Sequence, residues 1–256
     1  MKKVHQPLVI GNWKMNPASL VLAKKLAREL KKKLGLQQEI TTVLVPPFVY
    51  TESVRTLLGN SKAILLGAQD AFSEGEGSYT SQISIPMLKD LGVRYVILGH
   101  SERRALGETD TEINAKLVAS IKAGLVGVLC VGEHKRDIGG QYLSFIEEQV
   151  RHALKGISKS KLDAITIAYE PLWAIGTGTN ATPADVHEIK LFIERILTDI
   201  YGRTNARRVR VLYGGSVNSK NARELYSEGA VDGFLVGGSS LKAEEFASIV
   251  RTLTHS

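Results

Sequence analysis

The chain has 256 residues, 43% of them hydrophobic, and carries a formal net charge of +7. No run of 18 apolar residues occurs, which argues against a membrane span, and the polar residues before the first apolar run argue against a secretory signal. One cysteine, Cys130, excludes an internal disulfide and is typical of a reducing compartment. We therefore expect a cytoplasmic protein.

The basic balance comes from 33 Lys and Arg residues against 26 Asp and Glu residues. The densest run, residues 31–33, closes a helix-like segment, where cations complement the carbonyl end of the helix dipole. Arg207 and Arg208 precede a strand and have no aromatic residues interleaved with them. The distribution therefore argues against nucleic-acid binding and favours attraction of small anionic substrates.

Apolar, β-branched runs recur eight times along the chain, and most are continuously apolar, as is typical of strands buried on both faces. They cover residues 8–10, 40–45, 63–66, 94–98, 125–131, 164–168, 209–212 and 231–236. Between them, helical spacing is clear at residues 19–34, 109–123 and 183–200. Each strand-helix unit averages about 32 residues, the size of a βαβ repeat.

Two folds fit this alternation, a doubly wound open sheet and a closed (β/α)8 barrel. An open sheet predicts a G-x-G-x-x-G turn after an early strand, but the first strand runs into Gly11-Asn12-Trp13-Lys14. Polar and glycine residues follow many of the strands, as at a barrel mouth. We predict a single (β/α)8 TIM barrel domain over residues 1–256, with its active site at the carboxyl ends of the strands.

The most informative segment surrounds Glu170, which follows an apolar run and precedes Pro171. The pattern predicts a catalytic base on a rigid strand end, followed by a glycine-bearing loop, residues 174–178, able to close over a substrate. After the first strand, Asn12 and Lys14 are predicted to face one way and Trp13 and Met15 the other. A solvated loop is the alternative there.

His100 follows the fourth strand and precedes a short helix start containing Ser101 and Glu102. A helix N-terminus disfavours a cation, so this imidazole is expected to stay neutral and to donate a hydrogen bond. The alternative is a structural histidine that caps a turn. The other five histidines show no metal-ligand spacing, so we expect no metal. Cys130 is interpreted as a small buried side chain rather than a nucleophile.

Glycine turns follow the last two strands, at residues 213–217 and 236–241, and each opens a helix-like segment. Glycine lets backbone amides approach an anion closely, so the pair predicts a phosphate site. Either turn alone would be read as a tight connection. A phosphate site after strands seven and eight recurs in phosphate-binding barrels.

Together these motifs resemble the triosephosphate isomerase family over essentially the whole chain. The resemblance rests on residues 11–16, 99–104, 169–171, 173–178, 213–217 and 232–238, in that order. It implies interconversion of dihydroxyacetone phosphate and D-glyceraldehyde 3-phosphate through an enediol(ate), in glycolysis and gluconeogenesis, with no cofactor.

The resemblance also implies roles for individual residues. Glu170 would be the base and His100 the neutral electrophile, a pairing long established for this family. Lys14 would add positive charge and Asn12 a polar contact, with Glu102 supporting Lys14. The substrate would be held by Asn12, Lys14, Gly176, Ser216, Gly237 and Gly238.

The family's third βα loop inserts into a partner subunit, which implies a homodimer. Here the loop reads Gly77-Ser78-Tyr79-Thr80-Ser81-Gln82. Thr80 is kept, but Gln82 stands where a glutamate pairs with an arginine such as Arg103 across the interface, so we expect that ion pair to be lost.

Three alternatives to this function remain. An isomerase of a related aldose-ketose phosphate, such as a tetrose phosphate, is the nearest. An aldolase or lyase would place a Schiff-base lysine at the end of a middle strand, where this chain has Glu170. A non-catalytic scaffold would not need the catalytic positions that this chain retains.

Overall fold

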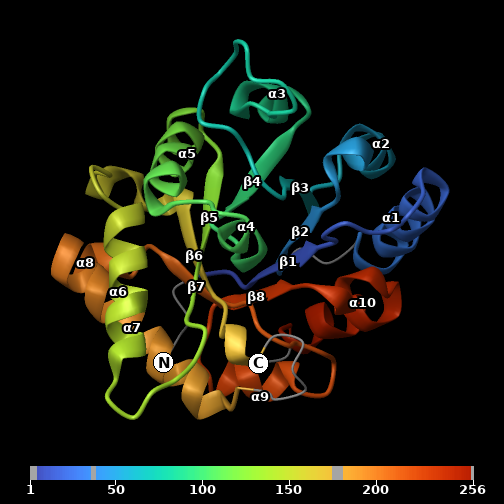
Figure 1. The fold of residues 1–256 in the computed structure, drawn as a ribbon. Coiled ribbons are helices and arrows are strands. Elements are labelled where there is room, and N and C mark those ends of the chain that lie inside the picture. Colours follow the sequence, from blue (N-terminus) through green and yellow to red (C-terminus); the bar gives the residue numbers. More distant parts are fainter. Residues whose placement is uncertain (1–4, 36–38, 175–180, 255–256) are drawn as a thin grey trace.

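Eight parallel strands close into a barrel in this computed structural model, which describes residues 5–35, 39–174 and 181–254 (Figure 1). The strands are β1 Leu8–Asn12, β2 Thr41–Val45, β3 Ile64–Ala68, β4 Val93–Leu98, β5 Val126–Val131, β6 Ile165–Tyr169, β7 Arg210–Tyr213 and β8 Gly233–Val236. All eight coincide with the predicted apolar runs. Because β8 pairs with β1, no edge strand is left, and the (β/α)8 barrel is confirmed over the open sheet.

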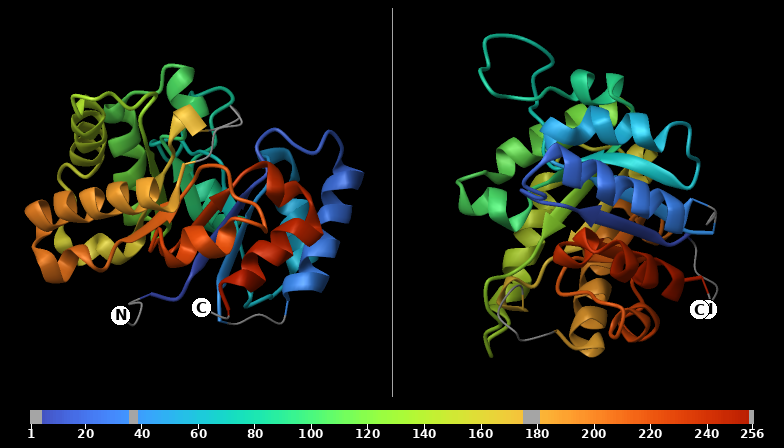
Figure 2. Two further views of the ribbon diagram at one scale, coloured as in Figure 1. Left: turned by 90° about the horizontal axis from the view of Figure 1, so that it is seen from below. Right: turned by 90° about the vertical axis from the view of Figure 1, so that its right-hand side faces the viewer.

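Helices surround the barrel on its outside (Figures 1 and 2). They are α1 Leu20–Leu34, α2 Phe48–Leu58, α3 Ile85–Asp90, α4 Ser101–Ala105, α5 Asp110–Lys122, α6 Gln141–Ala153, α7 Pro183–Tyr201, α8 Arg203–Ala206, α9 Ala222–Ser227 and α10 Ala243–Thr252. Three short 3₁₀ helices also occur among the described residues: η1 Lys159–Ala164, η2 Leu172–Ala174 and η3 Gly238–Leu241.

The three helices predicted from spacing begin where their capping residues stand. Ser19 accepts from the Leu22 amide at the start of α1. Thr109 and Thr182 each form a reciprocal capping box, with Glu112 and Asp185, at the starts of α5 and α7. The predicted helix limits are therefore correct to about one residue, because local side-chain hydrogen bonds set them.

The strands are apolar on both faces because the barrel has two packing layers. Inside it lies a cluster formed by alternate residues of the strands, including Ile10, Val43, Ile97, Val128 and Leu212. The intervening residues pack against the helices outside. This double burial explains why the strands show no polar alternation.

Barrel closure depends on a glycine at the start of β8. Gly233 has a φ of +147°, and a Cβ placed there would lie 1.8 Å from the Leu8 carbonyl oxygen. Any larger residue would force β8 away from β1.

One connection projects from the barrel. The residues between β3 and α3 form a long loop in which positions 74–82 are all exposed, and it extends beyond the neighbouring helices in the right-hand view of Figure 2. Thr80 and Gln82 lie on this protruding loop. In the described part of the chain, no helix has the length and apolar character needed to cross a membrane.

Candidate active site

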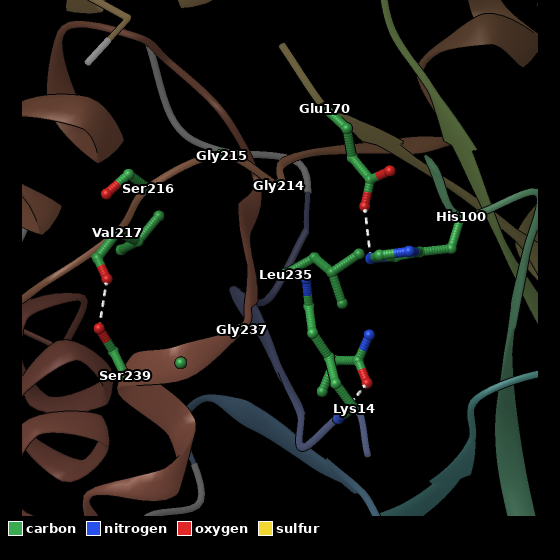
Figure 3. Close-up of a pocket in the computed structure, with 12 residues that line it drawn as sticks. Lys14, His100, Glu170, Gly214, Gly215, Ser216, Val217, Leu235, Gly237 and Ser239 are labelled. Carbon is green, nitrogen blue, oxygen red and sulfur yellow. Dashed lines mark hydrogen bonds and ion pairs between the residues drawn. The ribbon is translucent and has the colours of Figure 1, made fainter. Parts of the chain in front are cut away.

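A cavity of about 220 Å³ opens at the carboxyl ends of the strands (Figure 3). Its walls contain every predicted substrate-site residue that the structure describes. These are Asn12 at the end of β1, Lys14 after β1, His100 after β4, Glu170 after β6, Ser216 after β7, and Gly237 and Gly238 after β8. Gly176 lies outside the described residues, as does most of the loop that was expected to close.

Glu170 is held at the wall of this cavity with only 2% of its surface exposed. Its amide donates to the Val131 carbonyl at 2.8 Å, which extends the β5–β6 ladder by one residue. Its carboxylate Oε2 accepts from the Ser101 amide at 3.0 Å, and Oε1 lies 3.2 Å from His100 Nε2 (Figure 3). The carboxylate therefore lies beside the His100 ring, a potential hydrogen-bond donor, in the wall of the cavity.

The His100 ring is neutral in this geometry. His100 is the N-cap of α4, and its Nδ1 accepts from the Glu102 amide at 3.2 Å. Because a backbone N–H can only donate, Nδ1 carries a lone pair, and the ring proton resides on Nε2, which faces the cavity. The predicted helix-start position is correct, and the ring both caps the helix and lines the cavity.

Lys14 adopts a left-handed backbone conformation, with φ of 52°. Its amide donates to Asn12 Oδ1 at 3.0 Å, and Gln69 Nε2 donates to its carbonyl at 2.7 Å. This turn corrects one prediction: Trp13 is fully buried but Met15 is 93% exposed, so they do not share a face. A left-handed residue between them breaks the alternation that an extended segment would show.

Lys14 Nζ donates to Glu102 Oε1 at 2.7 Å. Partial burial by itself would raise the pKa of the Glu102 carboxyl, but the hydrogen bond and charge of Lys14 hold that pKa below its usual value. Glu102 is therefore ionised at neutral pH, and it holds the ammonium group at the cavity.

The two glycine turns are tied together on the opposite side of the cavity. Ser239 Oγ donates to the Val217 carbonyl at 2.7 Å (Figure 3). Ser240 Oγ donates to the Asn12 carbonyl at 3.2 Å, which joins the second turn to β1. A Cβ at Gly238 would meet no protein atom within 4 Å, so the backbone there is open to a ligand. Backbone groups and a nearby lysine are a suitable set for a phosphate dianion.

The segment after Glu170 is anchored by Glu133, which the sequence patterns did not single out as a site residue. Glu133 Oε1 accepts from Tyr169 Oη at 2.8 Å and from Trp173 Nε1 at 2.7 Å. Burial raises the pKa of Tyr169, and the Glu133 charge raises it further, so the phenol stays protonated as a donor. The only sequence signal was the acidic residue that follows Gly132 at the end of the fifth apolar run.

Cys130 is fully buried inside the barrel. Burial raises the pKa of its thiol well above the usual value, and the nearby Glu170 carboxylate raises it further. A neutral thiol is a poor nucleophile, which supports its interpretation as a small packing residue.

The residues expected at a subunit interface lie apart from the cavity. Thr80 and Gln82 are exposed on the projecting loop. Arg103 Nε lies 3.1 Å from Asp70 Oδ2 in the same chain. Arg103 thus already has a carboxylate beside it without Gln82.

No group of three or more His, Cys, Asp or Glu side chains able to hold a metal ion occurs among the described residues. The expectations of a metal-free and cofactor-free site stay predictions.

Comparisons with known proteins agree with the barrel fold. The family model described as "Triosephosphate isomerase" matches residues 7–253. Similar proteins of that name include one from Dehalococcoides mccartyi, 45% identical over 97% of this chain and 96% of its own length. Another, from Caldanaerobacter subterraneus, is 44% identical over 96% of this chain and 99% of its own length. Identity of this level over nearly the full length of both compared sequences places the chain in the triosephosphate isomerase family.

Proposed function

We propose that Glu170 and His100 carry out the isomerisation of dihydroxyacetone phosphate and D-glyceraldehyde 3-phosphate in this cavity. Glu170 removes a proton from the carbon beside the carbonyl group, and His100 Nε2–H donates to the carbonyl oxygen as negative charge develops there. Glu170 then returns the proton to the neighbouring carbon, which was the carbonyl carbon. The hydroxyl oxygen on the first carbon gives up its proton, and the former carbonyl oxygen gains one by way of His100 Nε2, so that the new carbonyl group forms. The observation that carries the proposal is the ionisable carboxylate 3.2 Å from the protonated nitrogen of a neutral imidazole, in one buried wall.

The enediolate formed between these two steps is an anion, and the site offers fixed positive charge for it. Lys14 lines the cavity and is held there by Glu102, while Asn12 Oδ1 fixes the turn that carries Lys14. Donors that are already oriented need no rearrangement when the charge develops, which lowers the barrier. This arrangement supports Lys14 and Asn12 as the remaining catalytic residues.

The phosphate group is proposed to bind between Ser216, Gly237 and Gly238, with Gly176 as a further phosphate contact. A Gly238→Val variant tests this half of the cavity, because its Cβ meets no protein atom and its φ is not positive. We expect normal folding, but affinity for inorganic phosphate and 1/KM lowered about 10- to 100-fold, since a side chain would displace a charged ligand from its hydrogen bonds. Competitive inhibition by inorganic phosphate measures the affinity, and the melting temperature checks that the variant folds normally.

Gly139→Val is a control in a loop away from the cavity. Unchanged phosphate inhibition in Gly238→Val would rule out the proposed phosphate position. Comparing turnover of triose and tetrose phosphates by the parent protein tests the sugar itself, and faster turnover of the tetrose phosphate would favour the alternative substrate.

We further propose that the protein forms a homodimer through the projecting loop. Beside the active site lies a second cavity of about 350 Å³, whose lining includes Asn12, Lys14 and His100. Its rim carries large exposed apolar side chains: Met15 at 93%, Leu106 at 79% and Phe48 at 46% exposure. Residues 74–82 of a second copy would cover them, and burial of that apolar surface would favour association.

Sedimentation equilibrium is expected to give a dimer at micromolar concentration. Gln82→Glu should tighten it only a few-fold, because an exposed ion pair contributes about 0.2–1 kcal/mol and Arg103 already has Asp70 beside it. Gln141→Glu, which adds the same charge on an exposed part of α6, should leave the dimer unchanged. A fully active monomer at nanomolar concentration would contradict the proposed interface.

A further inference from the structure

A buried amide side chain holds the end of β5 next to the proposed base. Gln149, on α6, is only 3% exposed. Its Oε1 accepts from the Gly132 amide at 2.9 Å, and its Nε2 donates to the Gly132 carbonyl at 3.3 Å. One side chain thus satisfies both backbone groups of a single residue.

The barrel itself has no partner for these two groups. The carbonyls on either side of Gly132 bind the segment that follows β6: Val131 accepts from the Glu170 amide and Glu133 from the Leu172 amide. In a strand, successive residues direct their backbone groups to opposite sides, so Gly132 faces the β4 side. There β4 has ended at Leu98. Gln149 therefore stands where a neighbouring strand would continue.

Gly132 in turn sets the position of Glu170. A Cβ at Gly132 would lie 1.8 Å from the Glu170 carbonyl oxygen and 2.6 Å from its carbonyl carbon, so the two main chains are in direct contact. A shift of Gly132 cannot be absorbed without moving Glu170, because no side chain separates them.

Packing alone does not hold this region. A cavity of about 410 Å³ adjoins it, and Gly132, Gln149, Glu170 and Leu172 all contribute to its lining. The cavity gives Gly132 room to move on that side, although the strand-end residues themselves are buried. The two hydrogen bonds of Gln149 hold the Gly132 backbone against movement into the cavity.

From these contacts we infer that Gln149 is a positioning residue for Glu170: it fixes the Gly132 backbone, and through it the carboxylate's height over the substrate carbon. The inference rests on the proposed function of Glu170. The proton transfer depends on that height. Phosphate binding does not, because it uses the glycine turns across the cavity.

The test compares Gln149→Met, which keeps the side-chain length and removes both hydrogen bonds, with the parent protein. We expect kcat per folded molecule to fall about 10- to 100-fold, since a displacement near 1 Å can cost that much in a proton transfer. KM and inhibition by inorganic phosphate should change less than about threefold, because the phosphate half is untouched. Gln149→Glu keeps an acceptor for the Gly132 amide but offers its carbonyl no donor, and its kcat should lie between the other two.

Two controls separate positioning from general stability. Ile146→Val removes a methylene from a fully buried residue of the same helix and should lower the melting temperature with kcat unchanged. Glu148→Gln, on the exposed side of α6, should change neither. A kcat within twofold of the parent in both Gln149 variants would overturn the inference, as would equal losses of kcat and phosphate affinity. An inactive parent protein would instead refute the proposed function.

Discussion

Replacing Glu170 by aspartate is expected to lower kcat by about 10²- to 10³-fold with little change in phosphate binding. The shorter side chain withdraws the carboxylate by about 1.5 Å, one carbon–carbon bond, and misplacement by about 1 Å can cost 10²-fold in rate. It also weakens the contacts of Glu170 with the Ser101 amide and His100 Nε2. A coupled assay with each triose phosphate measures kcat in both directions.

Glu170→Gln retains the size of the side chain but cannot take up the proton, and should lose up to about 10⁴-fold, the upper range for a general base. Glu52→Asp, at an exposed position of α2, is the matched control and should keep full activity. If Glu170→Asp retained activity within tenfold of the parent and still bound phosphate normally, another residue would have to be the base.

Replacing Lys14 by methionine is expected to lower kcat/KM by at least about 10³-fold. A single neutral donor to a developing oxyanion is worth about 10²–10³, and charged donors are stronger. Loss of the ammonium group also leaves the Glu102 carboxylate unpaired beside an anionic substrate. Its pKa then rises, because the hydrogen bond and charge of Lys14 that lowered it are gone.

The unpaired Glu102 carboxylate in Lys14→Met allows a second test of the role of Lys14. The double variant Lys14→Met/Glu102→Gln should lose less activity than Lys14→Met alone, because the unpaired negative charge is removed. Glu102→Gln alone should lower kcat/KM less than about tenfold, since an exposed ion pair contributes little. Lys25→Met, on the exposed surface of α1, should leave kcat/KM unchanged. A Lys14→Met variant with near-parental kcat/KM would exclude Lys14 from the reaction.

Much of the architecture could be predicted because its signals are local. A strand buried on both faces is continuously apolar, and a helix start carries its own cap, as Thr109 and Thr182 do. The carboxyl ends of parallel strands meet at one mouth, so polar residues after five different strands could be expected together. The expected facing of Trp13 and Met15 was wrong because the left-handed turn at Lys14 is held by Asn12 and by Gln69, which is 55 positions away.

The sequence by itself determined the family, the barrel and the residue types at its mouth, since each can be recognised from short runs of neighbouring residues. Only the tertiary structure decided how those residues act on one another. The ionised Glu102 beside Lys14 and the amide of Gln149 clamping Gly132 are contacts between separate elements. Periodicity describes one element at a time, whereas such contacts arise only once barrel closure has brought distant elements within hydrogen-bond distance.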